Sequence, residues 1–590
     1  MKQFQIAYET DEAFLEALEE IKQWCSENTA HAVLFRIYSG DMELAHVKHV
    51  CDILSEQMPQ ALYYGCTTQA NILEGALATT EISLSCTVFE YDTTQVQMLQ
   101  LPFGEEDVTQ TVRQLRQFCQ DNPWVSAVEV HATILGMSMR QFCAEISTLR
   151  SDIQIFGGGA CNTNPYDLTT SVFSKGNGIT DHGIVFLLLG GRDLHTYSMF
   201  ISGWKPLKRR FKITKSTGAT LYELDGEPAL NIYRRFLNIE NSDNLVSNTL
   251  EFPLFTDQNG VDVMRCPTAA DADGTLFMTA EVDEGADVRL AYGDPETILT
   301  SIRRDGQNIA NFRPETIQTF SCAARRAFWS DDNISDETIL FNSVAPTSGF
   351  YTGGELLRVD GIVHHFNVTL VLVAMREGEP KNDPVVDLYD TRLDNLENNR
   401  IPLIRRFVSF IEASTTELEE TNSKLSRLSV TDGLTGLYNR SEIERRIRSA
   451  VEARAQSGAS DALSVIMLDI DDFKKINDRY GHKEGDRVII ALADILREVM
   501  ADMPSASLGR WGGEEFMVLL PDKDINEAEK LAETIRARFA TVTYETAGCQ
   551  TASLGVARAR DGEDADTLYT RVDTAMYTAK ANGKNPVVRL

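Results

Sequence analysis

The stretch "GRWGGEEFMVLLP" (509–521) places two glycines and two glutamates directly before an apolar run. The apolar run predicts a buried strand, and the Gly-Gly pair predicts a hairpin turn that Glu514 and Glu515 would occupy. A second apolar run, "LSVIMLDI" (463–470), predicts another buried strand with Asp469 at its end. If these strands are neighbours in one sheet, Asp469 and Glu514 converge at the same edge.

Carboxylates that converge in this way, with few other protein groups beside them, suit a Mg²⁺ ion shared with substrate phosphates. Gly512 and Gly513 would let the backbone approach a phosphate or a ribose closely. Lys580, Lys584 and Arg510 would neutralise the remaining phosphate charge. The short motif alone leaves a second interpretation open, which is a hairpin with a solvated acidic turn.

The region around this hairpin, residues 431–590, alternates predicted helices and strands. The expected strands are 463–470, 516–521 and 551–559, and the expected helices are 473–481, 484–500, 526–540 and 566–583. Helices and strands that alternate around a central hairpin predict a ferredoxin-like palm.

Residues 1 to about 385 mix short, β-rich apolar runs with helical stretches, and Gly-rich turns such as "FGGGA" (156–160) separate them. This pattern predicts an α/β region in two lobes, with a break in the polar stretch 238–245. The whole chain is therefore expected to be an α/β multidomain protein, with its first two parts at 1–240 and 241–385.

The polar region 386–430 lacks strand patterns and carries a heptad repeat. The repeat alternates steps of four and three residues through Ile404, Val408, Ile411, Thr415, Leu418, Asn422 and Leu425. This spacing predicts a helical linker that forms a dimeric coiled coil, and an Asn at a core position favours a parallel two-stranded register. A solvated helix between domains is the alternative.

Composition limits the classes of partner and compartment. A net charge of −31 over 590 residues argues against nucleic-acid polymers and anionic membranes as partners. The ten cysteines form no CxxC pair, so we expect reduced thiols in a cytoplasmic protein. The longest apolar runs, 183–190 and 368–375, are too short to span a bilayer, and the N-terminus does not resemble a signal peptide.

Residues 431–590 resemble the GGDEF domain of the diguanylate cyclase family. Four spaced motifs carry the resemblance in family order: "TDGLTGLYNR" (431–440), "LDIDDFKKINDRYGHKEGD" (468–486), "RWGGEEF" (510–516) and "DTAMYTAKANGKN" (573–585). The resemblance implies an enzyme that condenses two GTP into cyclic di-GMP and releases two pyrophosphates. Because each domain holds one GTP, it also implies a homodimer.

The resemblance also assigns roles to residues of this chain. Asp469, the Ile470 carbonyl and Glu514 would bind Mg²⁺, with Mn²⁺ as a possible substitute. Asn477 and Asp486 would read the guanine edge, since a carboxylate accepts from its N–H groups. The remaining expected substrate contacts are Phe473, Lys474, His482, Lys580 and Lys584.

Two features bear on catalysis and its control. Glu514 or Glu515 would help to take the proton of the attacking 3′-hydroxyl, and the sequence does not divide this role between them. Many family members carry an inhibitory RxxD motif that binds the product. Met503 and Ala506 occupy those positions here, so we expect this chain to lack that form of product inhibition.

Residues 1–385 resemble the FIST sensory domain, with its N- and C-terminal parts. The segments that carry the resemblance are "YYGCTT" (63–68), "FGGGA" (156–160), "SGWKP" (202–206), "TGATLYELDGEPALNIY" (217–233), "FSCAARR" (320–326) and "GFYTGGELLRVDGIVHHFNVTLVLVAM" (349–375). The resemblance implies a small ligand, either amino acid-like or nitric oxide through haem. Haem would need His364 or His365 as its ligand, and Arg325 or Arg326 would anchor a carboxylate.

The leading interpretation is therefore a ligand-regulated diguanylate cyclase. The alternative is a catalytically silent GGDEF module that binds GTP or docks a protein as a regulator. The presence of Asp469, Asn477, Asp486 and both signature glutamates favours activity.

Overall fold

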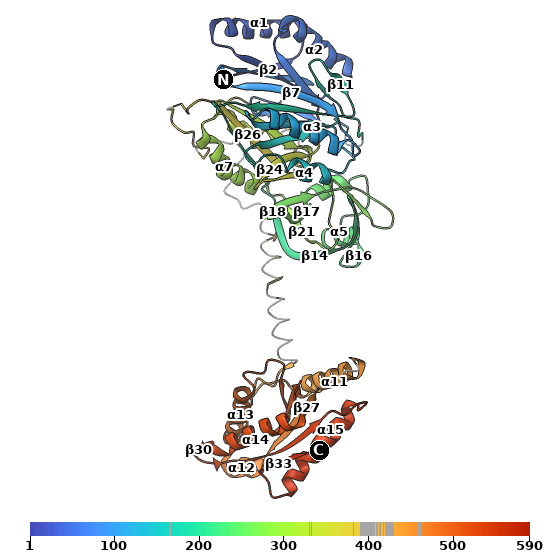
Figure 1. Cartoon of the computed structure of the whole chain (residues 1–590), viewed down its shortest axis with the longest axis vertical. Coiled ribbons are helices and arrows are strands. Elements are labelled where there is room, and N and C mark those ends of the chain that lie inside the picture. The colour runs from blue at the N-terminus through green and yellow to red at the C-terminus, as the bar shows by residue number, and fades with distance from the viewer. Residues whose placement is uncertain are drawn as a thin grey trace. The chain divides into compact units, whose positions relative to one another are not determined.

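The computed structural model describes residues 1–164, 167–329, 331, 333–381, 383–389, 430–457 and 462–590, with six separate positions between 407 and 418. The chain divides into two compact units, Met1–Glu412 and Ala413–Leu590. Each unit combines helices with sheets, which confirms the α/β class (Figure 1). Every helix in the described ranges is too short or too polar to reach across a bilayer.

The first unit contains three six-stranded sheets. The first sheet has the order β1 (Lys2–Tyr8), β6 (Ile82–Phe89), β2 (Ala32–Ser39), β3 (Leu62–Thr67), β10 (Val172–Ser174) and β11 (Gly178–Thr180). The second has the order β25 (Ile362–Phe366), β24 (Glu355–Val359), β9 (Gln154–Gly159), β8 (Val125–Ala132), β12 (Gly183–Gly190) and β7 (Gln95–Pro102). The third has the order β13 (Leu194–Ile201), β26 (Leu370–Glu377), β22 (Thr316–Cys322), β23 (Thr347–Thr352), β4 (Ala70–Leu73) and β5 (Ala76–Leu77).

A fourth sheet of eight strands lies within residues 205–292 and has its own apolar core. Its order is β18 (Val261–Arg265), β17 (Leu254–Gln258), β21 (Asp287–Tyr292), β14 (Lys205–Thr217), β15 (Thr220–Leu224), β20 (Leu276–Met278) and β19 (Pro267–Ala270), with β16 (Glu227–Pro228) beside β15.

Two helices of the first unit, α1 and α7, begin at residues whose side chains cap them. Thr10 accepts from the Ala13 N–H at the start of α1, and Asp294 accepts from the Thr297 N–H at the start of α7, which has Pro295 in its first turn. The described helices are α1 (Asp11–Glu27), α2 (Leu44–Gln57), α3 (Val108–Asp121), α4 (Arg140–Ile146), α5 (Ala229–Leu237), α6 (Leu245–Leu250), α7 (Pro295–Phe312), α8 (Ala323–Trp329), the 3₁₀ helix η1 (Ile334–Glu337) and α9 (Ile339–Asn342).

The sheets combine strands from both sides of the break expected at 238–245. Strand β24 pairs with β9, and β4 pairs with β23, although each pair is separated by almost 200 residues or more in the sequence. The two expected parts therefore share hydrogen-bonded sheets, and the boundary near residue 240 stays a prediction.

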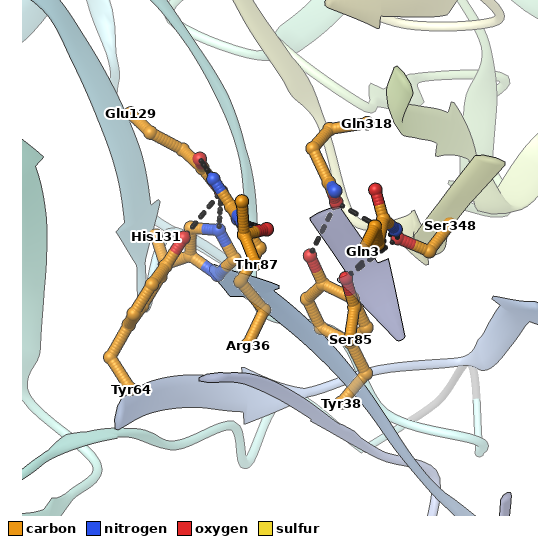
Figure 2. Close-up of polar contacts among 10 residues, drawn as sticks. All are labelled: Gln3, Arg36, Tyr38, Tyr64, Ser85, Thr87, Glu129, His131, Gln318 and Ser348. Carbon is orange, nitrogen blue, oxygen red and sulfur yellow. Dashed lines mark hydrogen bonds and ion pairs between the residues drawn. The ribbon is translucent and has the colours of Figure 1, made fainter. Parts of the chain in front are cut away.

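Two buried polar clusters join the first six-stranded sheet, one to the second sheet and one to the third (Figure 2). The Arg36 guanidinium on β2 lies 2.9 Å from the Glu129 carboxylate on β8, and the Tyr64 hydroxyl donates to Glu129 at 2.6 Å. In the second cluster, the Tyr38 hydroxyl donates to the Gln318 side-chain oxygen on β22. These groups are fully buried, so their mutual hydrogen bonds replace those to water.

The second unit is one five-stranded sheet with helices on both faces (Figure 1). Its strand order is β28 (Ser507–Gly512), β29 (Glu515–Pro521), β27 (Leu463–Ile470), β32 (Ala552–Arg558) and β33 (Val587–Arg589), and β30 (Thr543–Tyr544) pairs with β31 (Gly548–Cys549). Its helices are α11 (Arg440–Ser457), α12 (Phe473–Tyr480), α13 (His482–Val499), α14 (Ile525–Thr541) and α15 (Ala565–Ala581).

Alternating side chains of β27 fill the two cores of this unit. Ile466 and Leu468 pack with α13 and α14, whereas Val465 and Met467 pack with α11 and α15. Both faces of β27 are thus buried, which explains why its residues before Asp469 are apolar except for Ser464. Strands β27, β29 and β32 and helices α12 to α15 correspond to the elements predicted for the palm, whereas α11 and β33 were not predicted.

Most of the expected coiled coil lies outside the described residues. Ile404, Asn422 and Leu425 lie outside the described residues. The other four positions of the repeat, Val408, Ile411, Thr415 and Leu418, are helical. The dimeric coiled coil stays a prediction.

Candidate functional site

Strands β27 and β29 bring the predicted carboxylates to one edge of the second unit's sheet. The strands are antiparallel neighbours, and their register sets Asp469 opposite Glu515. The Ile470 N–H points to the Glu514 carbonyl oxygen at 3.4 Å. Asp469 is 5% exposed, so its carboxylate lies at the inner side of this edge.

The glycines before the glutamates shape the turn between β28 and β29. The pairing is irregular between Arg510 and Gly512. Gly513 has a φ of +36°, and a Cβ added there would have no atom within 4 Å. A glycine is therefore needed at 513 for its backbone conformation, and the turn is open beside it.

The charges at this edge interact strongly. Burial raises the pKa of Asp469, while the Lys580 ammonium, 2.6 Å from its Oδ2, opposes that rise. Burial also raises the pKa of Glu515, and the negative charge of Asp469 adds to this rise. The edge thus concentrates negative charge beside one lysine, and a bound cation would relieve the repulsion.

The predicted guanine-reading residues come together at the contact of α12 with α13. The Asn477 Oδ1 atom is buried without a hydrogen-bond partner. A Cβ added at Gly485 would lie 2.0 Å from that oxygen, so the glycine makes room for the Asn477 side chain. Asp486 follows Gly485 directly, and both Asp486 and His482 are exposed on α13.

The other predicted substrate contacts lie close by in the chain. Phe473 is buried at the start of α12, and Lys474 beside it is exposed. Lys584 forms an ion pair with Asp472 at 2.7 Å, which places it at the beginning of the same helix.

Arg510 makes contacts that the sequence did not predict. Its Nη1 lies 3.2 Å from both oxygens of Asp432, and its Nε donates to the Gly513 carbonyl at 2.9 Å. The guanidinium therefore links the opening segment of the unit to the signature turn. Its predicted role on phosphate stays a prediction.

Asp471 was also missed, although it lies within the quoted motif. Its carboxylate accepts from the Thr551 and Ser553 hydroxyls, each at 2.7 Å, and from the Asn585 N–H at 3.1 Å. These hydrogen bonds hold the end of β27 against β32. They also hold it against the backbone of Asn585, next to Lys584. In the sequence, the only indication of this role is that Asp471 lies between two other acidic residues, Asp469 and Asp472.

The residues at the edge fit a magnesium ion that substrate helps to hold. In the part of the chain that the structure describes, no cluster of three or more His, Cys, Asp or Glu side chains could hold a metal by itself. Asp469 and Glu514 supply hard carboxylate oxygens and leave other positions to phosphate and water, as Mg²⁺ prefers.

Comparisons with known proteins identify the domains. The family described as "Diguanylate cyclase, GGDEF domain" matches residues 429–586, the FIST N domain matches 33–227, and the FIST C domain matches 229–358. The chain is 34% identical to the diguanylate cyclase VdcA of Vibrio cholerae over 228 residues, which are 35% of this chain and 65% of that protein. It is 39% identical to the diguanylate cyclase DgcM of Escherichia coli K12 over 173 residues, which are 29% of this chain and 41% of that protein.

A similar solved structure is the coiled coil and GGDEF domain of DgcB from Caulobacter crescentus in complex with c-di-GMP, at 27% identity and a TM-score of 0.30. That match covers 32% of this chain and all of the other. The chain thus spans less than two thirds of the curated relatives VdcA and DgcM. The family matches show that this chain carries FIST N and FIST C domains followed by a GGDEF domain, as its motifs predicted.

Proposed function

We propose that the protein is a diguanylate cyclase that condenses two GTP into cyclic di-GMP. The observation that carries the proposal is the edge at which Asp469 faces Glu515, next to Glu514 and beside Lys580. The names of the relatives VdcA and DgcM support the same activity.

The residues of the site have distinct tasks in this proposal. Asn477, whose oxygen lacks a partner, and Asp486 bind the guanine edge. Lys580, Lys584 and Lys474 hold the phosphates, and Phe473 and His482 line the nucleotide. Gly512 and Gly513 leave space for the ribose and phosphates at the turn.

The reaction forms one bond and breaks another at each α-phosphorus. The 3′-oxygen of one GTP attacks the α-phosphorus of the second, and the bond from that phosphorus to the pyrophosphate oxygen breaks. Glu514 or Glu515 takes the hydroxyl proton in this proposal. Asp469, the Ile470 carbonyl and Glu514 would hold a magnesium ion, which would supply positive charge to the phosphates. The same step repeated closes the ring, so two copies must face each other.

The proposal is tested on the purified full chain with GTP and either Mg²⁺ or Mn²⁺. Mass spectrometry should detect cyclic di-GMP, and Asp469→Asn should lower its rate of formation by at least about 100-fold. GTP that binds without any product would favour the alternative, a silent module that acts as a regulator.

A second expectation concerns the missing inhibitory motif. Met503 and Ala506 are partly buried and pack against the apolar core of the second unit. Side chains of this kind offer no charge to the phosphates or the guanine of the product. We expect added cyclic di-GMP to leave the initial rate unchanged, and the double variant Met503→Arg, Ala506→Asp to become inhibited. Inhibition of the unmodified protein that these changes do not alter would contradict this expectation.

The FIST domains supply the regulatory part of the proposal. They would bind a small ligand and control how two GGDEF domains meet. Arg325 is not free to anchor that ligand, because Glu337 pairs with it at 2.5 Å and the Ser202 and Val368 carbonyls accept from it.

A further inference from the structure

The loop between α15 and β33 contains three consecutive residues with left-handed backbones. Their φ angles are +107° at Gly583, +67° at Lys584 and +61° at Asn585. A glycine just beyond a helix commonly adopts this conformation, whereas other residues adopt it rarely and then singly. Contacts from outside the loop must therefore hold residues 584 and 585, and residues held in this way cluster at functional sites.

Asp471 at the end of β27 holds this loop by its backbone. The Asn585 N–H donates to Asp471 Oδ2 at 3.1 Å and to the Ser553 hydroxyl oxygen at 3.3 Å. The Ser553 hydroxyl itself donates to Asp471 Oδ1 at 2.7 Å. Asp471 is buried, so water competes little for these hydrogen bonds, and a carboxylate accepts more strongly than a neutral oxygen.

Arg536 on α14 holds the same loop by a side chain. Its Nη1 donates to the Asn585 Oδ1 at 3.0 Å, and Glu533 keeps the guanidinium in place through an ion pair at 2.6 Å. Asparagine suits this position, because it tolerates a left-handed backbone better than most residues and also supplies an acceptor. Asn585 is thus held from two separate elements, at its backbone by Asp471 and at its side chain by Arg536.

Lys584 is the residue that this loop presents to the nucleotide site. Its Nζ lies 2.7 Å from Asp472 Oδ2, and both side chains are exposed. Lys475 also pairs with Asp472, at 3.0 Å, so this carboxylate keeps a partner when Lys584 leaves it. An exposed ion pair contributes little stability, so a triphosphate with several negative charges can replace Asp472 as the partner of Lys584.

We propose that Asp471 and Arg536 are positioning residues that hold Asn585 so that Lys584 exchanges Asp472 for the phosphates of the nucleotide. Neither residue touches the nucleotide in this arrangement, and both act through the backbone of the loop. Without them, residues 584 and 585 would relax towards an ordinary backbone and the Lys584 ammonium would move away. This inference rests on the proposed function, in which Lys584 holds phosphate.

Binding is tested by isothermal titration calorimetry of the full chain with Mg²⁺ and a GTP analogue. The analogue has a methylene group between its α- and β-phosphorus, so it cannot release pyrophosphate. Asp471→Asn and Lys584→Met should each raise its Kd by about tenfold. The double variant should bind no more weakly than Lys584→Met alone, because both changes act through one ammonium group. An unchanged Kd in Asp471→Asn, or effects that multiply in the double variant, overturns the proposal.

A second variant reaches the loop without altering β27, in case Asp471→Asn does not fold. Arg536→Met removes only the hydrogen bond to the Asn585 side chain, so the Kd should rise by about threefold or more. Arg538→Met is the matched control, because Arg538 lies on the same helix, is exposed and pairs with Glu498 at 3.5 Å. The control should bind the analogue as the unmodified chain does. An equal Kd in Arg536→Met and Arg538→Met overturns the role of Arg536.

Turnover separates the role through Lys584 from an effect on the neighbouring Asp469. Asp471→Asn should raise the KM for GTP by about tenfold and change kcat by less than about twofold, because the loss is in phosphate binding. A lower kcat at an unchanged KM would mean that Asp471 acts through Asp469, which overturns the proposal. If the unmodified chain forms no cyclic di-GMP, the proposed cyclase fails, while the calorimetry still decides the roles of Asp471 and Arg536.

Discussion

At the scale of single residues, Glu129 shows how the first unit tolerates charge in its interior. Its carboxylate is fully buried, which by itself raises its pKa. Arg36 and His131 outweigh that effect and hold the pKa of Glu129 at about 2. The folded protein therefore keeps this carboxylate ionised, whereas the unfolded chain protonates it near 4.5.

This shift predicts a specific loss of stability in acid. A depressed folded-state pKa stabilises the fold fully above about pH 4.5, and the contribution disappears as the pH falls towards about 2. Glu129→Gln should destabilise the first unit by about 3–5 kcal/mol at neutral pH, because Arg36 loses its counter-charge. It should also remove part of the acid sensitivity in urea unfolding measured by tryptophan fluorescence.

The matched control is Glu19→Gln, since Glu19 is 69% exposed and pairs with Lys22 on the surface. That change should alter stability by less than about 1 kcal/mol. If both variants unfold alike, Glu129 does not have the stabilising role that its contacts indicate.

The residues of the candidate site divide into those that sequence could place and those that it could not. Asp469 lies near the end of β27 and Glu514 directly precedes β29, so their predicted convergence needed only the assumption that the strands are neighbours. The partners of Arg510 and Asp471 depend on which of many polar groups the fold brings within reach. No local pattern in the sequence specifies such a choice, and it emerges only from tertiary packing.

At the scale of elements, apolar runs with polar or glycine ends gave the most accurate predictions. The runs 463–470 and 183–190 coincide with β27 and β12, because both strands are buried on two faces. The pairing of β24 with β9 was not predicted, since nothing local to either segment records a partner so distant in the sequence.

The contact of α12 with α13 allows a prediction at this scale. In Gly485→Ala the added methyl group would lie 2.0 Å from Asn477 Oδ1 and must displace that side chain. The KM for GTP should rise several-fold, while kcat changes less, because the loss is in nucleotide binding. Gly433→Ala is the control, since a Cβ at Gly433 meets no atom within 4 Å. An unchanged KM for Gly485→Ala would contradict the role of Asn477 in binding guanine.

At the scale of the whole molecule, activity should depend on pairing between copies, because in the proposed reaction each GGDEF domain would supply one of the two GTP. Ile411 and Leu418 are helical positions of the predicted repeat, and they are 57% and 64% exposed. Large apolar side chains exposed at heptad spacing are typical of a helix that pairs with a second copy.

The double variant Ile411→Glu, Leu418→Glu should therefore weaken the dimer, because the like charges would face each other across the seam. Light scattering should show a lower mass than for the unmodified chain, and cyclic di-GMP formation per chain should fall most at low protein concentration. Thr416→Glu, one position beyond the seam residue Thr415, should leave both properties unchanged. A double variant that stays dimeric and fully active would show that other surfaces bring the two GGDEF domains together.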